Sequence, residues 1–139
     1  MTRRFDDPQA WRGQAVSLAD IETLAARAYG RLPAHFRALC EDLVIRVEDF
    51  PSPDVLDSMG LRSRYDLLGL FQGIGLPFRQ EMTGTMPNMI WLYRKPILAY
   101  WTEREESLSA IVTHVLVHEI GHHFGFSDED MEVIEADAG

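Results

Sequence analysis

The sequence predicts an α+β fold in which a short mixed sheet packs on helices and a long C-terminal helix carries the functional residues. Helical periodicity comes first, short apolar runs follow it, and the longest helical segment lies near the end of the chain. Helices and strands do not alternate strictly, which disfavours a doubly wound parallel sheet. The 139 residues have the length of one domain. We therefore expect a flexible N-terminal lead-in, residues 1–16, and a single domain over residues 17–139.

Helical signals open the predicted domain. Ser17 and Asp20 have the spacing of a helix N-cap followed by an acidic residue at the third helical position. Apolar side chains then recur at helical spacing, which predicts a first helix that ends at Gly30. Pro33 can open a second, short helix after it.

Three predicted strands and one more short helix follow. We predict the strands over apolar or β-branched runs at residues 43–47, 67–71 and 89–93. A short helix is expected over residues 53–59, with Gly60 as its stop. Residues 76–88 form the longest irregular stretch, and residues 94–96 are expected to form a turn because of their proline.

The last predicted helix is the longest and extends roughly from Glu103 to Phe124. Its first turn would be acidic, which suits the positive end of a helix dipole. Gly125 is the expected stop. Four of the five histidines of the chain lie in this segment: His114, His118, His122 and His123.

The charge of the chain is unevenly distributed. The formal net charge is −9, and the whole excess of acidic residues lies in residues 103–139, which contain ten acidic residues and one basic residue. Nucleic-acid binding needs a basic surface, so we exclude a nucleic-acid partner. No apolar run approaches the roughly 20 residues of a membrane span, so we expect no membrane partner. The lack of an export signal and the unpaired Cys40 predict a cytoplasmic protein.

The segment His118-Glu119-Ile120-Gly121-His122 is an H-E-x-x-H motif on the predicted helix. Helix positions i and i+4 differ by only about 40°, so the two imidazoles can converge on one ion at typical Zn–N distances of about 2.0–2.1 Å. Glu119 stands at the edge of the same face, where its carboxylate can reach a water without being a ligand. The motif predicts a Zn²⁺ cofactor bound by His118 and His122, with Glu119 as the catalytic residue.

A third ligand is expected further along the chain. The pattern continues to H-E-x-x-H-x-x-G-x-x-D, ending at Asp128. Gly125 can adopt a left-handed conformation and turn the chain back, which would bring Asp128 beneath the histidines. Three protein ligands leave one position open, as in catalytic zinc sites. Asp128 could instead begin a further helix, and the third ligand would then be Glu132 or Glu135.

The two other histidines of the helix carry different expectations. His114 lies one turn before His118 but about 80° from His122, so it cannot easily join the same ligand set. We expect an ordinary surface histidine, and the alternative is a supporting role at the rim of the site. His123 projects toward the apolar stripe of the helix, and we expect it to be a hydrogen-bonded histidine of the core.

Three stretches of the chain resemble the minimal zincin family, which are small bacterial zincin-like metallopeptidases with a metzincin-type motif. The matching stretches are residues 67–73, 90–97 and 117–125. The resemblance covers most of residues 17–135 and implies an α+β zincin fold, a zinc ion and peptidase activity. The larger metzincins have a separate methionine turn far downstream that this sequence lacks, and Met131 could take its place.

We therefore expect a zinc-dependent hydrolase, namely a metallopeptidase that acts on a peptide or protein substrate. Glu119 would act as the general base toward a zinc-bound water and then return the proton to the leaving amine. An edge strand, such as residues 89–93, could align an extended substrate. The alternative is a non-catalytic zinc-binding interaction or regulatory module, which the small size of the chain favours.

Overall fold

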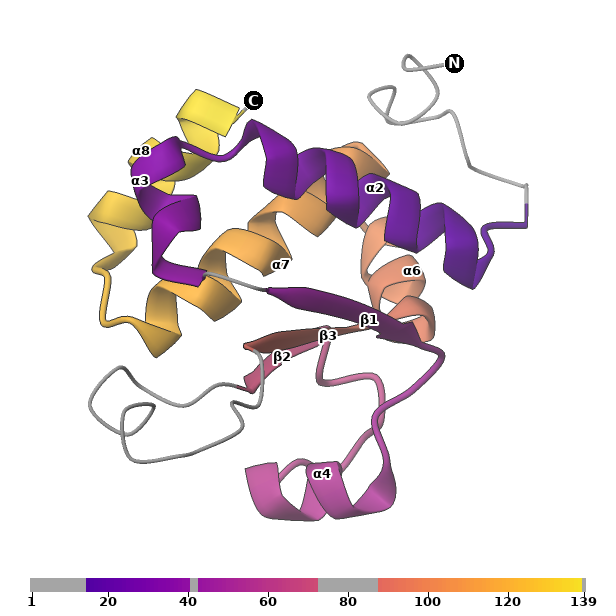
Figure 1. Ribbon diagram of the computed structural model, residues 1–139. Coiled ribbons are helices and arrows are strands. Elements are labelled where there is room, and N and C mark those ends of the chain that lie inside the picture. The colour runs from indigo at the N-terminus through magenta and orange to yellow at the C-terminus, as the bar shows by residue number, and fades with distance from the viewer. Residues whose placement is uncertain (1–14, 41–42, 73–87, 139) are drawn as a thin grey trace.

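The computed structural model describes residues 15–40, 43–72 and 88–138 of the chain. The fold is α+β, as predicted, with helices arranged around a small sheet (Figure 1). The sheet contains β1 (Val44–Glu48), β2 (Gly69–Gln72) and β3 (Met89–Tyr93) in the order β1-β3-β2. β1 is parallel to β3 and β2 is antiparallel to it, so the sheet is mixed.

The order of the strands corrects one expectation. The strand over residues 89–93 has the predicted bounds, but it is the central strand of the described sheet and not an edge. The side chains of Ile90, Leu92 and Tyr93 in this strand are buried, while those of Met89 and Trp91 are partly buried. β2 is the edge strand that lies beside the motif-bearing helix.

The N-terminal half of the fold follows the sequence signals closely. The helix α2 (Leu18–Arg31) begins with the predicted capping box, in which the side chain of Ser17 and that of Asp20 each accept a backbone hydrogen bond. The short helix α3 (Ala34–Arg37) and a 3₁₀ turn, η1 (Ala38–Cys40), come next. The helix α4 (Pro53–Met59) ends at Gly60, whose φ of 69° is left-handed.

Two predictions around the later helices were wrong. Residues 94–96 do not form a turn but open a helix, α6 (Arg94–Thr102). Pro96 lies in its first turn, where a backbone N–H has no partner within the helix and a proline is tolerated. The next helix, α7 (Leu108–His123), begins later than expected, because Ser107 caps it by accepting a hydrogen bond from the backbone of Ala110. The acidic residues around Glu103 therefore precede the helix.

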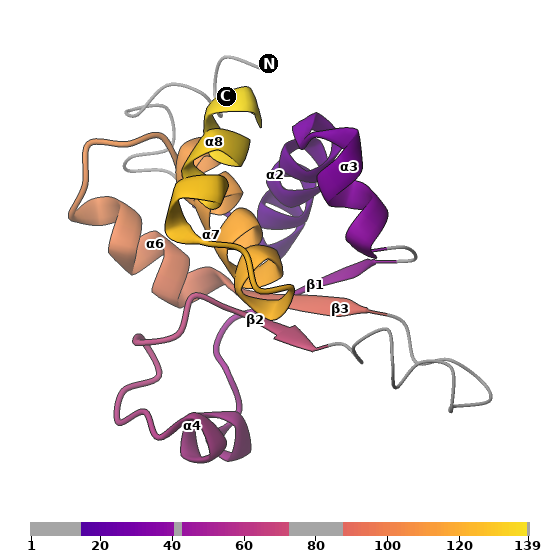
Figure 2. The ribbon, with the colours of Figure 1, turned by 90° about the vertical axis from the view of Figure 1, so that its left-hand side faces the viewer.

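The helices α2 and α7 pack against each other and cover one face of the sheet, while α4 lies on the opposite side (Figure 1). The last helix, α8 (Asp128–Ala138), packs against α7 (Figure 2). The largest fully buried side chains between these elements are Phe36, Ile21, Leu24, Leu32, Ile90, Leu92, Ile97, Leu108, Ile111, Leu116, Ile120 and Met131. None of the helices in the described part of the chain is long and apolar enough to cross a membrane.

The contact between α7 and the edge strand β2 depends on a glycine. A Cβ atom at Gly69 would lie 2.7 Å from Cγ1 of Val115 and 3.1 Å from the carbonyl oxygen of Trp91. Such distances are too short for any larger residue. The missing side chain lets β2 approach α7 closely, and this approach places the strand next to the motif.

Candidate metal centre

A row of three histidines runs along the C-terminal half of α7. His114, His118 and His122 are each four residues apart, so their side chains lie one above another on the same side of the helix. The ring centroids of His114 and His118 are 4.0 Å apart, and those of His118 and His122 are 5.6 Å apart. His118 is therefore the middle member of the row, with an imidazole on either side.

The chain turns back after α7 at the predicted glycine. Gly125 has a φ of 80°, and the backbone N–H of Phe126 donates a 2.8 Å hydrogen bond to the carbonyl of Gly121. Ser127 then caps α8 by accepting a 3.1 Å hydrogen bond from the backbone N–H of Asp130. Asp128 is thus both the last residue of the extended motif and the first residue of a further helix.

The packing of α8 on α7 is close because of a second glycine, the one inside the motif. A Cβ atom at Gly121 would lie 2.8 Å from Cγ of Met131, and closer still to its Sδ atom. Met131 itself is fully buried. The methionine therefore lies beneath the helical turn that joins His118 to His122.

The predicted ligands are only partly brought together. Nε2 of His122 lies 4.0 Å from Oδ1 of Asp128, and both side chains are exposed, at 60% and 87%. His118 is more buried, with 23% of its side chain exposed, and its Nε2 contacts Oε1 of Glu135 at 2.8 Å. Glu132, the other residue named as an alternative ligand, is exposed. The structure places Asp128 beside one histidine of the motif and Glu135 beside the other.

Glu119 lies in a cavity of about 240 Å³ between α7 and the chain that leads into β2. The backbone of Phe71 provides a hydrogen bond to its carboxylate. Burial raises the pKa of Glu119, while the charge of His122 and the hydrogen bond from Phe71 act in the opposite direction. The cavity is lined by Asp66, Leu67, Leu68, Gly69, Tyr100, His114, Val115, His118 and Glu119.

Tyr100 is a residue of this cavity that the sequence did not single out. It lies in α6, a helix that was not predicted, and the side chain of Arg104 stacks on its ring at 3.7 Å. Without α6, the sequence offered no reason to place Tyr100 near the motif rather than in the core. Tyr100 was therefore missed as a site residue because α6 was missed.

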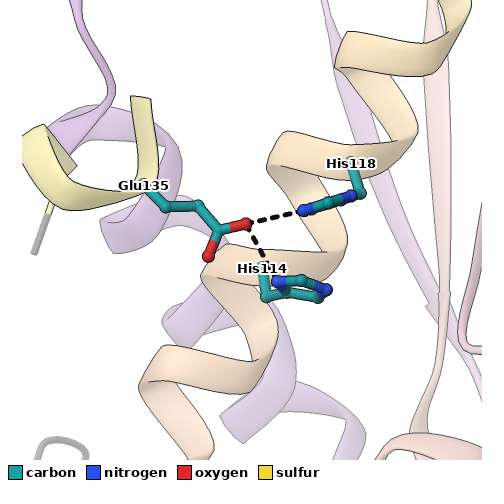
Figure 3. Close-up of side chains that lie close together, drawn as sticks. All are labelled: His114, His118 and Glu135. Carbon is teal, nitrogen blue, oxygen red and sulfur yellow. Dashed lines mark ion pairs between the residues drawn. The ribbon is translucent and has the colours of Figure 1, made fainter. Parts of the chain in front are cut away.

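A cluster of potential ligands in the described part of the chain differs from the predicted set. Nδ1 of His114, Nε2 of His118 and Oε1 of Glu135 all lie within 4.8 Å of one another (Figure 3). His114 is exposed, as expected of a surface histidine, and its Nδ1 also lies 2.9 Å from Oε1 of Glu135, which agrees with the alternative of a role at the rim of the site. The signal in the sequence was its spacing of four residues from His118. Burial and the neighbouring His114 lower the pKa of His118, and the carboxylate of Glu135 opposes this shift.

His123 is not the core histidine that its helical position suggested. Its side chain is exposed and stacks on the ring of Phe71, with centroids 4.2 Å apart. Because α7 ends at His123, no further turn of this helix follows to cover the ring. The contact lowers the pKa of His123 through partial burial.

A family model described as a zincin-like metallopeptidase matches residues 40–138. The chain belongs to this family. The match extends from η1 to the end of α8 and thus includes the sheet, the histidine row and both carboxylates next to it. A search of curated proteins finds no match.

Membership in the zincin-like family implies a metal ion, which is typically zinc, and the donor set of this chain fits one. Imidazole nitrogens and carboxylate oxygens are normal zinc ligands. One of these oxygens, Oε1 of Glu135, is shielded from solvent and lies within 2.9 Å of a ring nitrogen of both His114 and His118. A buried carboxylate oxygen in this state is stabilised by a cation.

Proposed function

We propose that this zincin-like protein is a zinc-dependent peptidase in which His118, His122 and Asp128 bind the metal and Glu119 is the general base. The observation that carries the proposal is the position of Glu119. Its carboxylate is fixed by the backbone of Phe71 in the same cavity as His118, the first histidine of the motif. A carboxylate held beside a potential metal ligand in a cavity open to substrate is what metal-assisted hydrolysis requires.

Each residue of the motif has a separate task in this proposal. A bound zinc ion would polarise the scissile carbonyl and make a water molecule more acidic. Glu119 accepts the proton of the attacking water on its carboxylate and donates it to the departing amine. His118 and His122 supply neutral nitrogen donors from adjacent turns of one helix. Asp128 is exposed, and its side chain is free to rotate toward His122 from the present 4.0 Å.

The edge of the sheet supports a peptide as the substrate. β2 is an edge strand of the described sheet, and the residues that lead into it line the cavity of Glu119. An extended peptide can add to such an edge through backbone hydrogen bonds, which recognise main chain rather than a particular side chain. This geometry favours peptide or protein substrates over small molecules.

Substitution of the proposed base tests the proposal. We expect Glu119→Gln to bind one zinc ion per chain but to hydrolyse peptides about 10²–10⁴-fold more slowly, because the amide cannot accept the proton. The assay follows cleavage of a library of internally quenched peptides by the zinc-loaded full chain. Glu106→Gln makes the same chemical change at an exposed position outside the site and serves as the matched control.

Two results would contradict the proposal. Equal rates for wild type and Glu119→Gln would remove Glu119 from the mechanism. Zinc that stabilises the wild type strongly, together with no cleavage of any library peptide, would favour the non-catalytic zinc-binding module instead. The two results separate a wrong assignment of the base from a wrong assignment of the activity.

A further inference from the structure

We propose that His114, His118 and Glu135 form a second position for a divalent cation such as Zn²⁺, adjacent to the proposed zinc site and sharing His118 with it. The side chains come from two helices and point toward one another (Figure 3). His114 and His118 extend from α7, and Glu135 extends from α8. Neither His114 nor Glu135 belongs to the H-E-x-x-H-x-x-G-x-x-D pattern.

The distances within this cluster are close to those of a ligand set. Oε1 of Glu135 lies 2.9 Å from Nδ1 of His114 and 2.8 Å from Nε2 of His118. Ligand atoms at zinc bond lengths of about 2.0–2.2 Å are separated by roughly 3.3 Å in a tetrahedral site. Side-chain rotations that shift these atoms by a few tenths of an ångström would bring the two N–O distances to this value.

The position of the Glu135 carboxylate also suits a shared cation. Oε1 of Glu135 is shielded from solvent and lies within 2.9 Å of a ring nitrogen of each histidine. A single metal ion between the three atoms would accept a lone pair from both nitrogens and from the buried oxygen. The side chains are thus gathered around one point, as a shared ion requires.

The two helices provide a carboxylate at each end of the histidine row. Asp128 and Glu135 are seven residues apart on α8, which corresponds to about 10 Å along a helix. His114 and His122 are eight residues apart on α7, or about 12 Å. Asp128 lies beside His122, whereas Glu135 lies beside both His114 and His118. His118 is the member of the row that both positions need.

The shared residue makes the two positions mutually exclusive. Nε2 of His118 has a single lone pair and can bind one metal ion at a time. A chain whose cation is bound at the second position would contain metal but would lack the ion beside His122 and Asp128. This consequence rests on the proposed function, since it requires His118 as a ligand in the proposed zinc site. The second position would then hold metal in a form that does not hydrolyse.

Zinc titration of the metal-free full chain by calorimetry tests the inference. We expect one zinc per chain in the wild type. We also expect one zinc per chain in His122→Gln, because His114, His118 and Glu135 remain. Adding Glu135→Gln to His122→Gln should weaken zinc binding at least tenfold, as loss of a ligand requires. Glu135→Gln alone should still bind one zinc through the motif.

A Co²⁺ titration adds a readout that does not depend on activity. The visible absorption of Co²⁺ reports its ligands, so the spectra of His122→Gln and Glu135→Gln should differ from each other. Glu129→Gln, an exposed carboxylate on the same helix, and His35→Gln, an exposed histidine on α3, are the matched controls. Thermal unfolding of each metal-free variant shows that it is folded before metal is added.

The inference is overturned if His122→Gln binds no zinc while the wild type binds one, or if Glu135→Gln has no effect in the His122→Gln background. Two zinc ions per wild-type chain would refute mutual exclusion. These outcomes are independent of hydrolysis. A protein that cleaves no peptide yet behaves as expected in the titrations would contradict the proposed function and leave the second position supported.

Discussion

Gly121 shows how one residue of the motif serves packing as well as chemistry. It lies between the two proposed histidine ligands, and its missing side chain makes room for the buried Met131. The motif allows any residue at this position, so the pattern alone gave no reason for a glycine. In the structure, the glycine brings α8, which carries Asp128 and Glu135, close to the histidine row.

We expect Gly121→Ala to lower the free energy of unfolding by about 1–3 kcal/mol, the usual cost of overpacking a close contact. Alanine has the higher helix propensity, so the steric conflict with Met131 must exceed a gain of about 1 kcal/mol. Chemical denaturation followed by circular dichroism measures the change.

Gly30→Ala is the matched control for this substitution. Gly30 also lies in a helix, but a Cβ atom there would have nothing within 4 Å. The control should therefore be neutral or stabilising by up to about 1 kcal/mol. Equal effects of the two substitutions would show that the contact with Met131 is easily relieved.

The sequence predicts the positions of some residues of the candidate site and not of others. The positions of His118, Glu119 and His122 on one helix follow from helical geometry alone, and so does the turn at Gly125. The partner of His118 does not follow, because Glu135 reaches it only through the packing of α8 on α7. The sequence reduced the candidates for the third ligand to Asp128, Glu132 and Glu135, and their spacing alone could not decide among them.

At the scale of single elements, the sequence predicted those with strong end signals. Ser17, Pro53 and Gly60 mark their helix ends by local chemistry, and the structure confirms all three. The helix α6 was missed because a proline indicates either a turn or a first helical turn, and its surroundings decide which. The central position of β3 was also missed, since the order of strands depends on contacts between distant residues.

Arg94 connects the start of α6 to two other parts of the fold. Its guanidinium lies 2.7 Å from Oδ1 of Asp49, just after β1, and donates a 2.6 Å hydrogen bond to the carbonyl of Val16, just before α2. The side chain is only 19% exposed. The start of α6 is thereby held against the ends of two other elements.

We expect Arg94→Lys to destabilise the protein by about 1–2 kcal/mol, because a single ammonium group cannot donate to both Asp49 and the carbonyl of Val16 as the guanidinium does. Thermal unfolding measures the loss. Arg62→Lys, the same change at an exposed position, should leave the midpoint nearly unchanged. A midpoint for Arg94→Lys equal to that of the control would show that one of the two contacts is sufficient.

At the scale of the whole molecule, stability should depend on pH through a buried thiol. Burial raises the pKa of Cys40 from 9.0 to about 11. Between these values, the unfolded chain loses the thiol proton while the folded chain keeps it, so rising pH favours unfolding. Burial raises the pKa values of Tyr29 and Tyr93 as well, which acts in the same direction.

We expect the free energy of unfolding to be insensitive to Cys40 below pH 9 and to fall by up to about 3 kcal/mol as the pH rises to about 11. Denaturation at a series of pH values measures this slope. In Cys40→Ala the slope should be smaller, even if the overall stability is lower. An unchanged slope would assign the pH dependence to other groups.

The pairing of the strands has a consequence for how the protein folds. Val44 is aligned with Met89 and Glu48 with Tyr93, so the parallel pair β1–β3 joins segments that are far apart along the chain. Closing such a long loop costs conformational entropy before the contacts between the two strands have formed, and this slows folding. The histidine row, by contrast, forms within a single helix. The rate of folding should therefore depend on the sheet, while the metal ligands on α7 can become aligned before the sheet is complete.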